Sequence, residues 1–86
     1  SFTRGLAKEV APLIRVNAIA PAAVLTDFLK ENISQERLDR ITEATPMKRL
    51  GRGEDTAAAV LFLCGAGSSY ITGELIDVSG GRKLAF

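Results

Sequence analysis

Hydrophobic positions at the start of the chain follow a helical spacing and then change to a short run. Apolar residues stand four apart at Phe2, Leu6 and Val10, so they share one side of a helix that Pro12 would end. Residues 14–20 are mainly apolar and partly β-branched, and they stop at Pro21, which has no N–H for a strand ladder. This pattern predicts a helix followed by a mostly buried strand.

Two capped helices are predicted in the middle of the chain. Thr26 and Asp27 can begin the first helix, and Ser34 can cap a second helix that Pro46 ends. One face of the second helix carries Leu38, Ile41 and Thr45. The rest of this segment is polar, and we expect it to be exposed.

A further helix is predicted after Gly53. Glu54 and Asp55 place negative charge at a helix N-terminus, where the helix dipole favours it. Residues 57–64 then run apolar until Gly65 offers a C-terminal stop. Because this apolar run is continuous, we expect the helix to be largely buried.

A second strand is predicted over residues 75–78, closed by Gly80 and Gly81. A strand, a connection with a packed helix and a second strand most simply form a right-handed crossover with parallel strands. Residues 1–86 therefore form a single α/β unit without an internal repeat or linker. Because two parallel strands are not a stable sheet, we expect other protein to cover the apolar edge of residues 14–20.

Composition and charge exclude several classes of function. Hydrophobic residues make up 47% of the chain and charged residues 24%, which is typical of a globular protein. Eleven basic and ten acidic residues are interspersed, with a net charge of +1, so no basic patch for nucleic acid or an anionic membrane is predicted. The longest apolar run is far below the roughly 20 residues that span a bilayer. We therefore expect neither a nucleic-acid nor a membrane partner.

Cysteine and histidine usage narrows the chemistry further. Cys64 is the single cysteine and histidine is absent, which excludes an internal disulfide and a Cys/His zinc site. Ser-His-Asp and Cys-His nucleophile systems need an imidazole and are excluded as well. The sequence thus predicts no metal site and a reducing, cytoplasmic setting.

Several motifs then resemble one family. Residues 3–9 (TRGLAKE) and 14–21 (IRVNAIAP) resemble the segment after the catalytic Tyr-x-x-x-Lys helix of short-chain dehydrogenases/reductases. The further motifs follow in the family's order over the whole chain: Thr26-Asp27, PMKRLG at 46–51, the Ala-rich helix through Cys64, YITG at 70–73, and Gly80-Gly81. The resemblance is strongest to 3-oxoacyl-carrier-protein reductases and to sugar or alcohol dehydrogenases. It implies the C-terminal third of an NAD(P)-binding, Rossmann-like doubly wound parallel sheet, with the last two strands.

The same resemblance implies a cofactor and substrate site. NAD or NADP would lie beyond the carboxyl ends of the strands, against Pro21, the backbone of Ala22 and Val24, and the Thr26 hydroxyl. The alternative is that Thr26 only caps a helix, and the two roles are compatible. Residues 25–47 correspond to a substrate lid in which an apolar pocket for a small carbonyl or alcohol substrate could be lined by Phe28, Leu29 and Met47. The alternative is that these three side chains are ordinary packing residues.

The sequence departs from the family pattern in three respects. Ala22 stands where glycine is usual, at a cost of about 1–2 kcal/mol if the backbone there is left-handed. Gly53 stands where proline is frequent, which weakens the helix by under about 1 kcal/mol. The catalytic tyrosine, lysine and serine are not recognisable, because Tyr70 is the only tyrosine and Glu74 follows it four residues later. The resemblance places the lysine about five residues before Ser1.

Three functions follow in order of preference. The first is a fragment of an NAD(P)-dependent oxidoreductase, inactive alone, whose parent protein is a homotetramer or homodimer. The second is a truncated, non-enzymatic module that acts in oligomerisation, and the third is an unrelated small α/β binding domain. The choice between NAD and NADP, and the identity of the substrate, stay open.

Overall fold

The computed structural model describes residues 2–22 and 24–82. The elements follow one another along the chain as α1 (Phe2–Val10), β1 (Ala18–Pro21), α2 (Asp27–Asn32), α3 (Gln35–Ala44), α4 (Gly53–Cys64), the 3₁₀ turn η1 (Ala66–Ser68) and β2 (Leu75–Val78). The predicted bounds of α1 and β2 are confirmed, as are the helix starts at Thr26 and Ser34.

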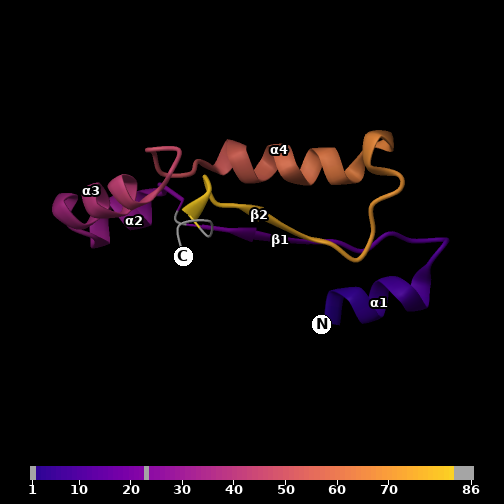
Figure 1. Cartoon of the computed structure of the whole chain (residues 1–86). Helices are drawn as coiled ribbons and strands as arrows, with labels where there is room; N and C mark the ends of the chain where they lie inside the picture. Colours follow the sequence, from indigo (N-terminus) through magenta and orange to yellow (C-terminus); the bar gives the residue numbers. More distant parts are fainter. Residues whose placement is uncertain (1, 23, 83–86) are drawn as a thin grey trace.

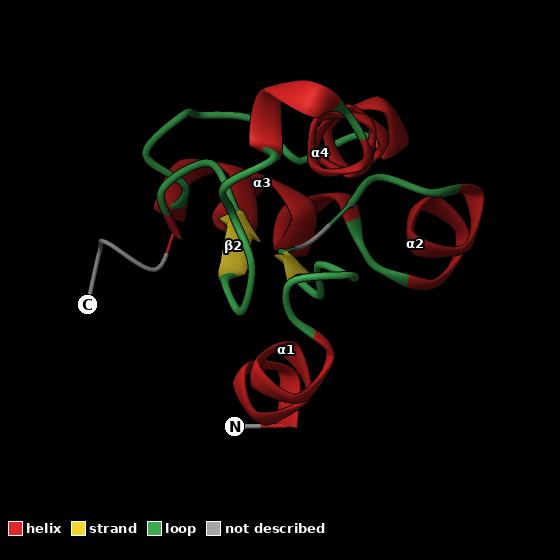
Figure 2. Cartoon of the chain, turned by 90° about the vertical axis from the view of Figure 1, so that its right-hand side faces the viewer, coloured by secondary structure: helices red, strands yellow, loops and turns green. Residues whose placement is uncertain are grey.

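The elements form three layers, and the middle layer is a short parallel sheet. β1 and β2 pair in parallel, with Ala18 opposite Leu75 and Pro21 opposite Val78, which confirms the predicted strand direction. Helix α4 runs along one face of the two strands and α1 lies on the other side (Figures 1 and 2). Helices α2 and α3 lie beyond the carboxyl ends of the strands (Figure 1), which makes the molecule elongated, at 47 × 26 × 21 Å.

Strand β1 begins later than the sequence pattern indicates, at Ala18 rather than at residue 14. The opposite segment turns at Gly73, whose φ of 75° takes it out of the extended conformation. Asn17 replaces the missing ladder contacts, because its Nδ2 donates to the Ile71 carbonyl at 3.1 Å and its Oδ1 accepts from the Glu74 N–H at 3.0 Å. Regular pairing therefore starts only where both segments are extended.

Arg15 joins the sheet to the end of α4. One guanidinium nitrogen donates to the Leu63 carbonyl at 2.8 Å, and the other donates to the carbonyls of Ser68 at 2.9 Å and Ile71 at 3.2 Å. The Ser68 side chain, which is fully buried, also accepts from Arg15 at 3.1 Å. The first bond satisfies a carbonyl in the last turn of α4, where no intrahelical N–H is available, and the others tie the segment after α4 to Arg15.

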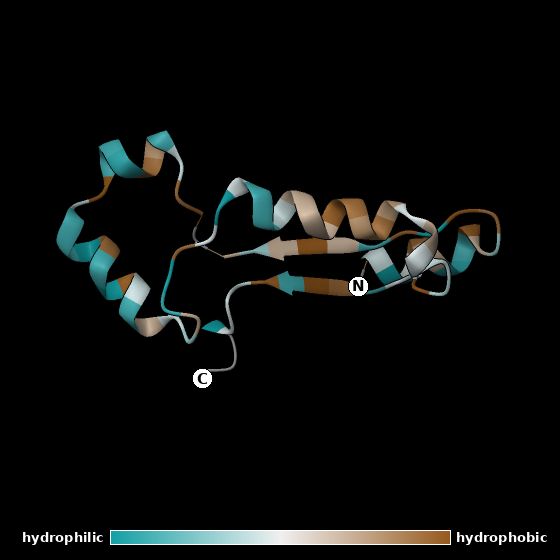
Figure 3. Ribbon diagram, turned by 90° about the horizontal axis from the view of Figure 1, so that it is seen from above, coloured by the Kyte–Doolittle hydropathy of each residue, from teal (hydrophilic) through white to brown (hydrophobic). Residues whose placement is uncertain are grey.

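The two helices beyond the strands have the predicted caps. The Thr26 and Ser34 hydroxyls each accept a hydrogen bond from the N–H three residues later, at 3.1 and 3.2 Å. Leu38 and Thr45 on the predicted face of the second helix are buried, as that face requires. Most of the remaining residues of these helices are polar and exposed (Figure 3), and the apolar exceptions are Phe28, Leu29, Ile41 and Ala44.

Helix α4 differs from the prediction that it would be largely buried. It carries no buried residue, and Val60, Leu61 and Phe62 are all exposed, although the second half of the helix is apolar (Figure 3). The physical reason is that within the described residues its only sheet has two strands of four residues, which cover one narrow side of a helix. Leu75 on β2 is exposed as well.

Candidate functional site

A cleft of about 260 Å³ lies at the carboxyl ends of the two strands. Ala22 borders it directly after β1, and Ser79 and Gly80 border it directly after β2. The cleft is also lined by Met47, which follows α3, by Arg49, and by Asp55 on the first turn of α4. The cleft therefore stands where parallel α/β sheets place their ligands, because loops diverge at the carboxyl edge of the strands.

The loop after β1 brings most of the predicted cofactor residues to this edge. The Ala22 N–H donates to the carbonyl of the last β2 residue at 3.1 Å, so it extends the pairing by one step beyond Pro21. Val24 forms a parallel bridge with Gly51, and Thr26 caps α2. Of these positions Ala22 lines the cleft itself, while Ala23 lies outside the described residues.

The two substitutions against the family pattern are accommodated by the local backbone. Lys48 is the single non-glycine residue with a positive φ in the part of the chain that the structure describes, so Ala22 does not adopt the left-handed conformation. The expected cost of about 1–2 kcal/mol at that position therefore does not arise. Gly53 is the first residue of α4, which is the position where proline fits a helix best.

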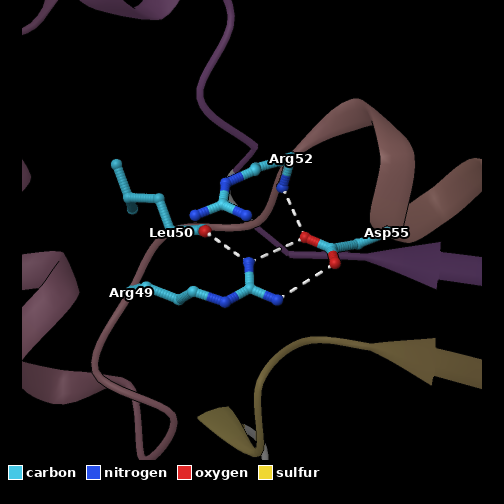
Figure 4. A network of polar contacts seen from close by, with 4 residues as sticks. All are labelled: Arg49, Leu50, Arg52 and Asp55. Carbon is cyan, nitrogen blue, oxygen red and sulfur yellow. Dashed lines mark hydrogen bonds and ion pairs between the residues drawn. The ribbon is translucent and has the colours of Figure 1, made fainter.

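An ion pair beside the cleft joins two segments that meet there (Figure 4). Arg49 binds both carboxylate oxygens of Asp55, at 2.8 and 3.0 Å, and donates to the Leu50 carbonyl at 3.1 Å. Asp55 also accepts from the Arg52 N–H at 2.7 Å. The Arg49 guanidinium, and secondarily the Arg52 N–H, hold the pKa of Asp55 well below its usual range, and Asp55 raises the pKa of Arg49.

Backbone contacts connect this ion pair to the loop after β1. Arg49 fixes the chain next to Gly51, and Gly51 in turn accepts from the Leu25 N–H at 2.8 Å and bridges Val24. Sequence reasoning found Asp55 only as a helix-dipole residue and missed Arg49. The signal was present in the motif RLGRGED, which places a cation six residues before an acidic helix start.

The three predicted substrate residues are not brought together. Met47 lines the cleft and is 66% exposed, and its N–H donates to the Gly80 carbonyl at 3.0 Å. Phe28 is 73% exposed on α2, Leu29 is half-buried there, and neither side chain lines the cleft. The substrate role of these two residues stays a prediction, since it requires α2 to approach the cleft.

Comparison with known proteins identifies the family. The family model described as Enoyl-(Acyl carrier protein) reductase matches residues 1–83. The chain belongs to the short-chain dehydrogenase/reductase family. It is 48% identical over 68 residues to 7alpha-hydroxysteroid dehydrogenase of Escherichia coli, covering 79% of this chain and 27% of that protein. It is 47% identical over 81 residues to the 3-oxoacyl-[acyl-carrier-protein] reductase FabG of Aquifex aeolicus, covering 93% of this chain and 32% of FabG.

Solved structures of short-chain dehydrogenases/reductases share its fold. A glucose/ribitol dehydrogenase from Brucella melitensis superimposes with a TM-score of 0.86 at 40% identity, over 94% of this chain and 33% of that one. A 7 alpha-hydroxysteroid dehydrogenase in complex with NADH and 7-oxo glycochenodeoxycholic acid gives a TM-score of 0.85 at 43% identity, over 93% and 32%. The chain thus has the α/β fold of part of a Rossmann-like sheet, and it spans about a third of the length of its relatives.

The remaining observations concern the single tyrosine of the chain and the lengths of its helices. Tyr70 is fully exposed and precedes β2, so it lies at the opposite end of the strands from the cleft. Among the described residues, none of the helices has the length and apolar character needed to cross a bilayer.

Proposed function

We propose that this chain is the C-terminal third of a cytoplasmic NAD(P)-dependent oxidoreductase that transfers hydride between nicotinamide and a small carbonyl or alcohol substrate. The observation that carries the proposal is the cleft at the carboxyl ends of two parallel strands, bordered by Ala22 from the loop after β1. Family membership supports the same reaction class. When bound, the cofactor supplies the hydride, and the chain's own residues bind and orient it.

Thr26 is the side chain best suited to contact the cofactor. Its hydroxyl oxygen accepts from the Leu29 N–H at 3.1 Å, and the residue is exposed. A hydroxyl has one donor hydrogen and two acceptor lone pairs, so the capping bond leaves the hydrogen for an amide or phosphate oxygen. The backbone at Ala22 and Val24 is held in place by its bonds to β2 and Gly51, so it presents a fixed surface to the nicotinamide.

The proton chemistry of the reaction is assigned to residues outside these 86. Tyr70 is the only tyrosine of the chain, and it lies at the wrong end of the strands to act at the cleft. We assign the substrate contacts to the lid, with Met47 at the cleft and Phe28 and Leu29 on α2. The exposed apolar side of α4 and Leu75 on β2 form the surface that we assign to homo-oligomer contacts.

Binding of NADH and NADPH to the purified protein, at the length expressed from its gene, tests this function. We expect one of the two dinucleotides to bind, with intact mass well above 9.2 kDa, and hydride transfer to a carbonyl substrate. Thr26→Ser keeps the hydroxyl and should retain affinity. Thr26→Asp keeps the cap but has no donor hydrogen, so cofactor affinity should fall. A protein that binds neither dinucleotide would refute the proposal.

A further inference from the structure

Three arginines gather beside the cleft, at a place that the proposed chemistry does not use. Arg37 and Arg40 stand three apart on α3, so they lie on one side of that helix. Arg82 follows β2 after the turn at Gly80 and Gly81, both of which have positive φ. Together with Ile41, these arginines line a hollow of about 350 Å³, which we call the arginine hollow.

The three guanidinium groups have no carboxylate partner among the described residues. The two ion pairs of this part of the chain involve other residues, and no hydrogen bond there uses the side chain of Arg37, Arg40 or Arg82. Arg37 and Arg40 carry like charges at neighbouring positions of one helix face, and such a pair is mildly unfavourable. Arg82 is moreover half-buried, which reduces the solvation of its charge. An anion in the hollow would relieve both costs.

The arginine hollow adjoins the cleft. Ile41 and Arg82 line both spaces, so the two spaces are immediate neighbours and one ligand of moderate length can reach both. The cleft is lined by two carboxylates, Asp55 and Asp77, and by Arg49, which is paired with Asp55, whereas the hollow is lined by arginines and one isoleucine. Carboxylates balance the positive charge in the cleft, and no carboxylate lines the hollow. This difference favours a molecule with an uncharged reacting end in the cleft and an anionic end in the hollow.

We propose that Arg37, Arg40 and Arg82 bind a phosphoryl group at the far end of the substrate. The inference rests on the proposed function, because it places the reacting carbonyl in the cleft. A phosphoryl group fits better than a carboxylate, because its several terminal oxygens can engage more than one guanidinium fork at once. Free phosphate would make the same contacts with the arginines. The second measurement below therefore distinguishes a phosphorylated substrate from free phosphate.

The first measurement is calorimetric titration of the intact protein with inorganic phosphate in a phosphate-free buffer. Losing one charge-assisted bidentate contact should weaken phosphate binding about 10-fold or more in Arg40→Gln. Lys8→Gln on α1 removes the same charge far from the hollow and should leave the affinity unchanged. Arg40→Lys keeps the charge without the fork and should give an intermediate affinity. Equal phosphate binding by Arg40→Gln and Lys8→Gln would overturn the site.

The second measurement compares a phosphorylated carbonyl substrate with its dephosphorylated form. Arg40→Gln should raise KM for the phosphorylated substrate about 10-fold or more and leave kcat/KM for the other form unchanged. If phosphate binding is lost in Arg40→Gln but both substrates respond alike, the site takes free phosphate and the substrate assignment is wrong. If phosphate binds through the arginines while no dinucleotide binds, the proposed function fails and the anion site stands.

Discussion

Gly80 offers the sharpest test of how the cleft is built, through the substitution Gly80→Ala. Its φ is +63°, a left-handed conformation that costs a residue with a Cβ about 1–2 kcal/mol. The added Cβ would stand 2.9 Å from Cγ2 of Thr45 and 3.4 Å from Cβ of Met47. Thr45 is buried and its hydroxyl donates to the Ile41 carbonyl at 2.7 Å, so it cannot move away freely.

Backbone strain and overpacking both destabilise the Gly80→Ala variant. Overpacking a filled site costs about 1–3 kcal/mol, so we expect Gly80→Ala to lower the free energy of unfolding by about 2–5 kcal/mol in total. Urea unfolding of the purified protein measures this change, and the slope of the transition should stay the same.

Gly5→Ala is the matched control. Gly5 lies inside α1 without a positive φ, and a Cβ added there would meet no heavy atom within 4 Å. Alanine is a better helix former than glycine, so this variant should raise the free energy of unfolding by about 0.5–1 kcal/mol. A Gly80→Ala protein as stable as the wild type would refute the packing described for the end of α3.

Three further predictions concern the contacts around α4. Arg15→Met removes the guanidinium bonds to the carbonyls of Leu63, Ser68 and Ile71 and should lower the free energy of unfolding by about 1.5–3 kcal/mol, measured by urea titration. Gly53→Pro places proline at the first residue of α4, after an Arg52 backbone (φ −121°, ψ 159°) that tolerates a following proline. It should stabilise by about 0.4–1 kcal/mol in the same titration, and a loss of stability would count against the helix start at Gly53. Asp55→Asn is tested by the pH dependence of the free energy of unfolding. The bond to Arg49 lowers the folded-state pKa of Asp55 below its unfolded value of about 3.9. The stability gap to the wild type should be present above about pH 4 and disappear as the pH falls through the lowered pKa, whereas a gap that persists in acid contradicts the ion pair.

Much of the site could be located from sequence. The parts that could not be located depend on turns that bring residues together. The loop after β1 and the caps at Thr26 and Ser34 were predictable, because each depends on residues only a few positions apart. The ion pair between Arg49 and Asp55 spans six residues across a turn, so helical or strand periodicity does not reveal it. The arginine hollow joins residues more than 40 positions apart, and only the turn after β2 brings Arg82 to α3.

The sequence by itself determined the order and type of the elements, the ends of α1 and β2, and the family. These features follow from apolar spacing, capping side chains and glycine or proline punctuation, which act over one or two turns of chain. Tertiary structure decided where β1 begins, because that depends on the turn at Gly73 in a segment far away along the chain. It also decided that α4 stays exposed, because burial depends on how much sheet lies beneath a helix and not on how apolar the helix is.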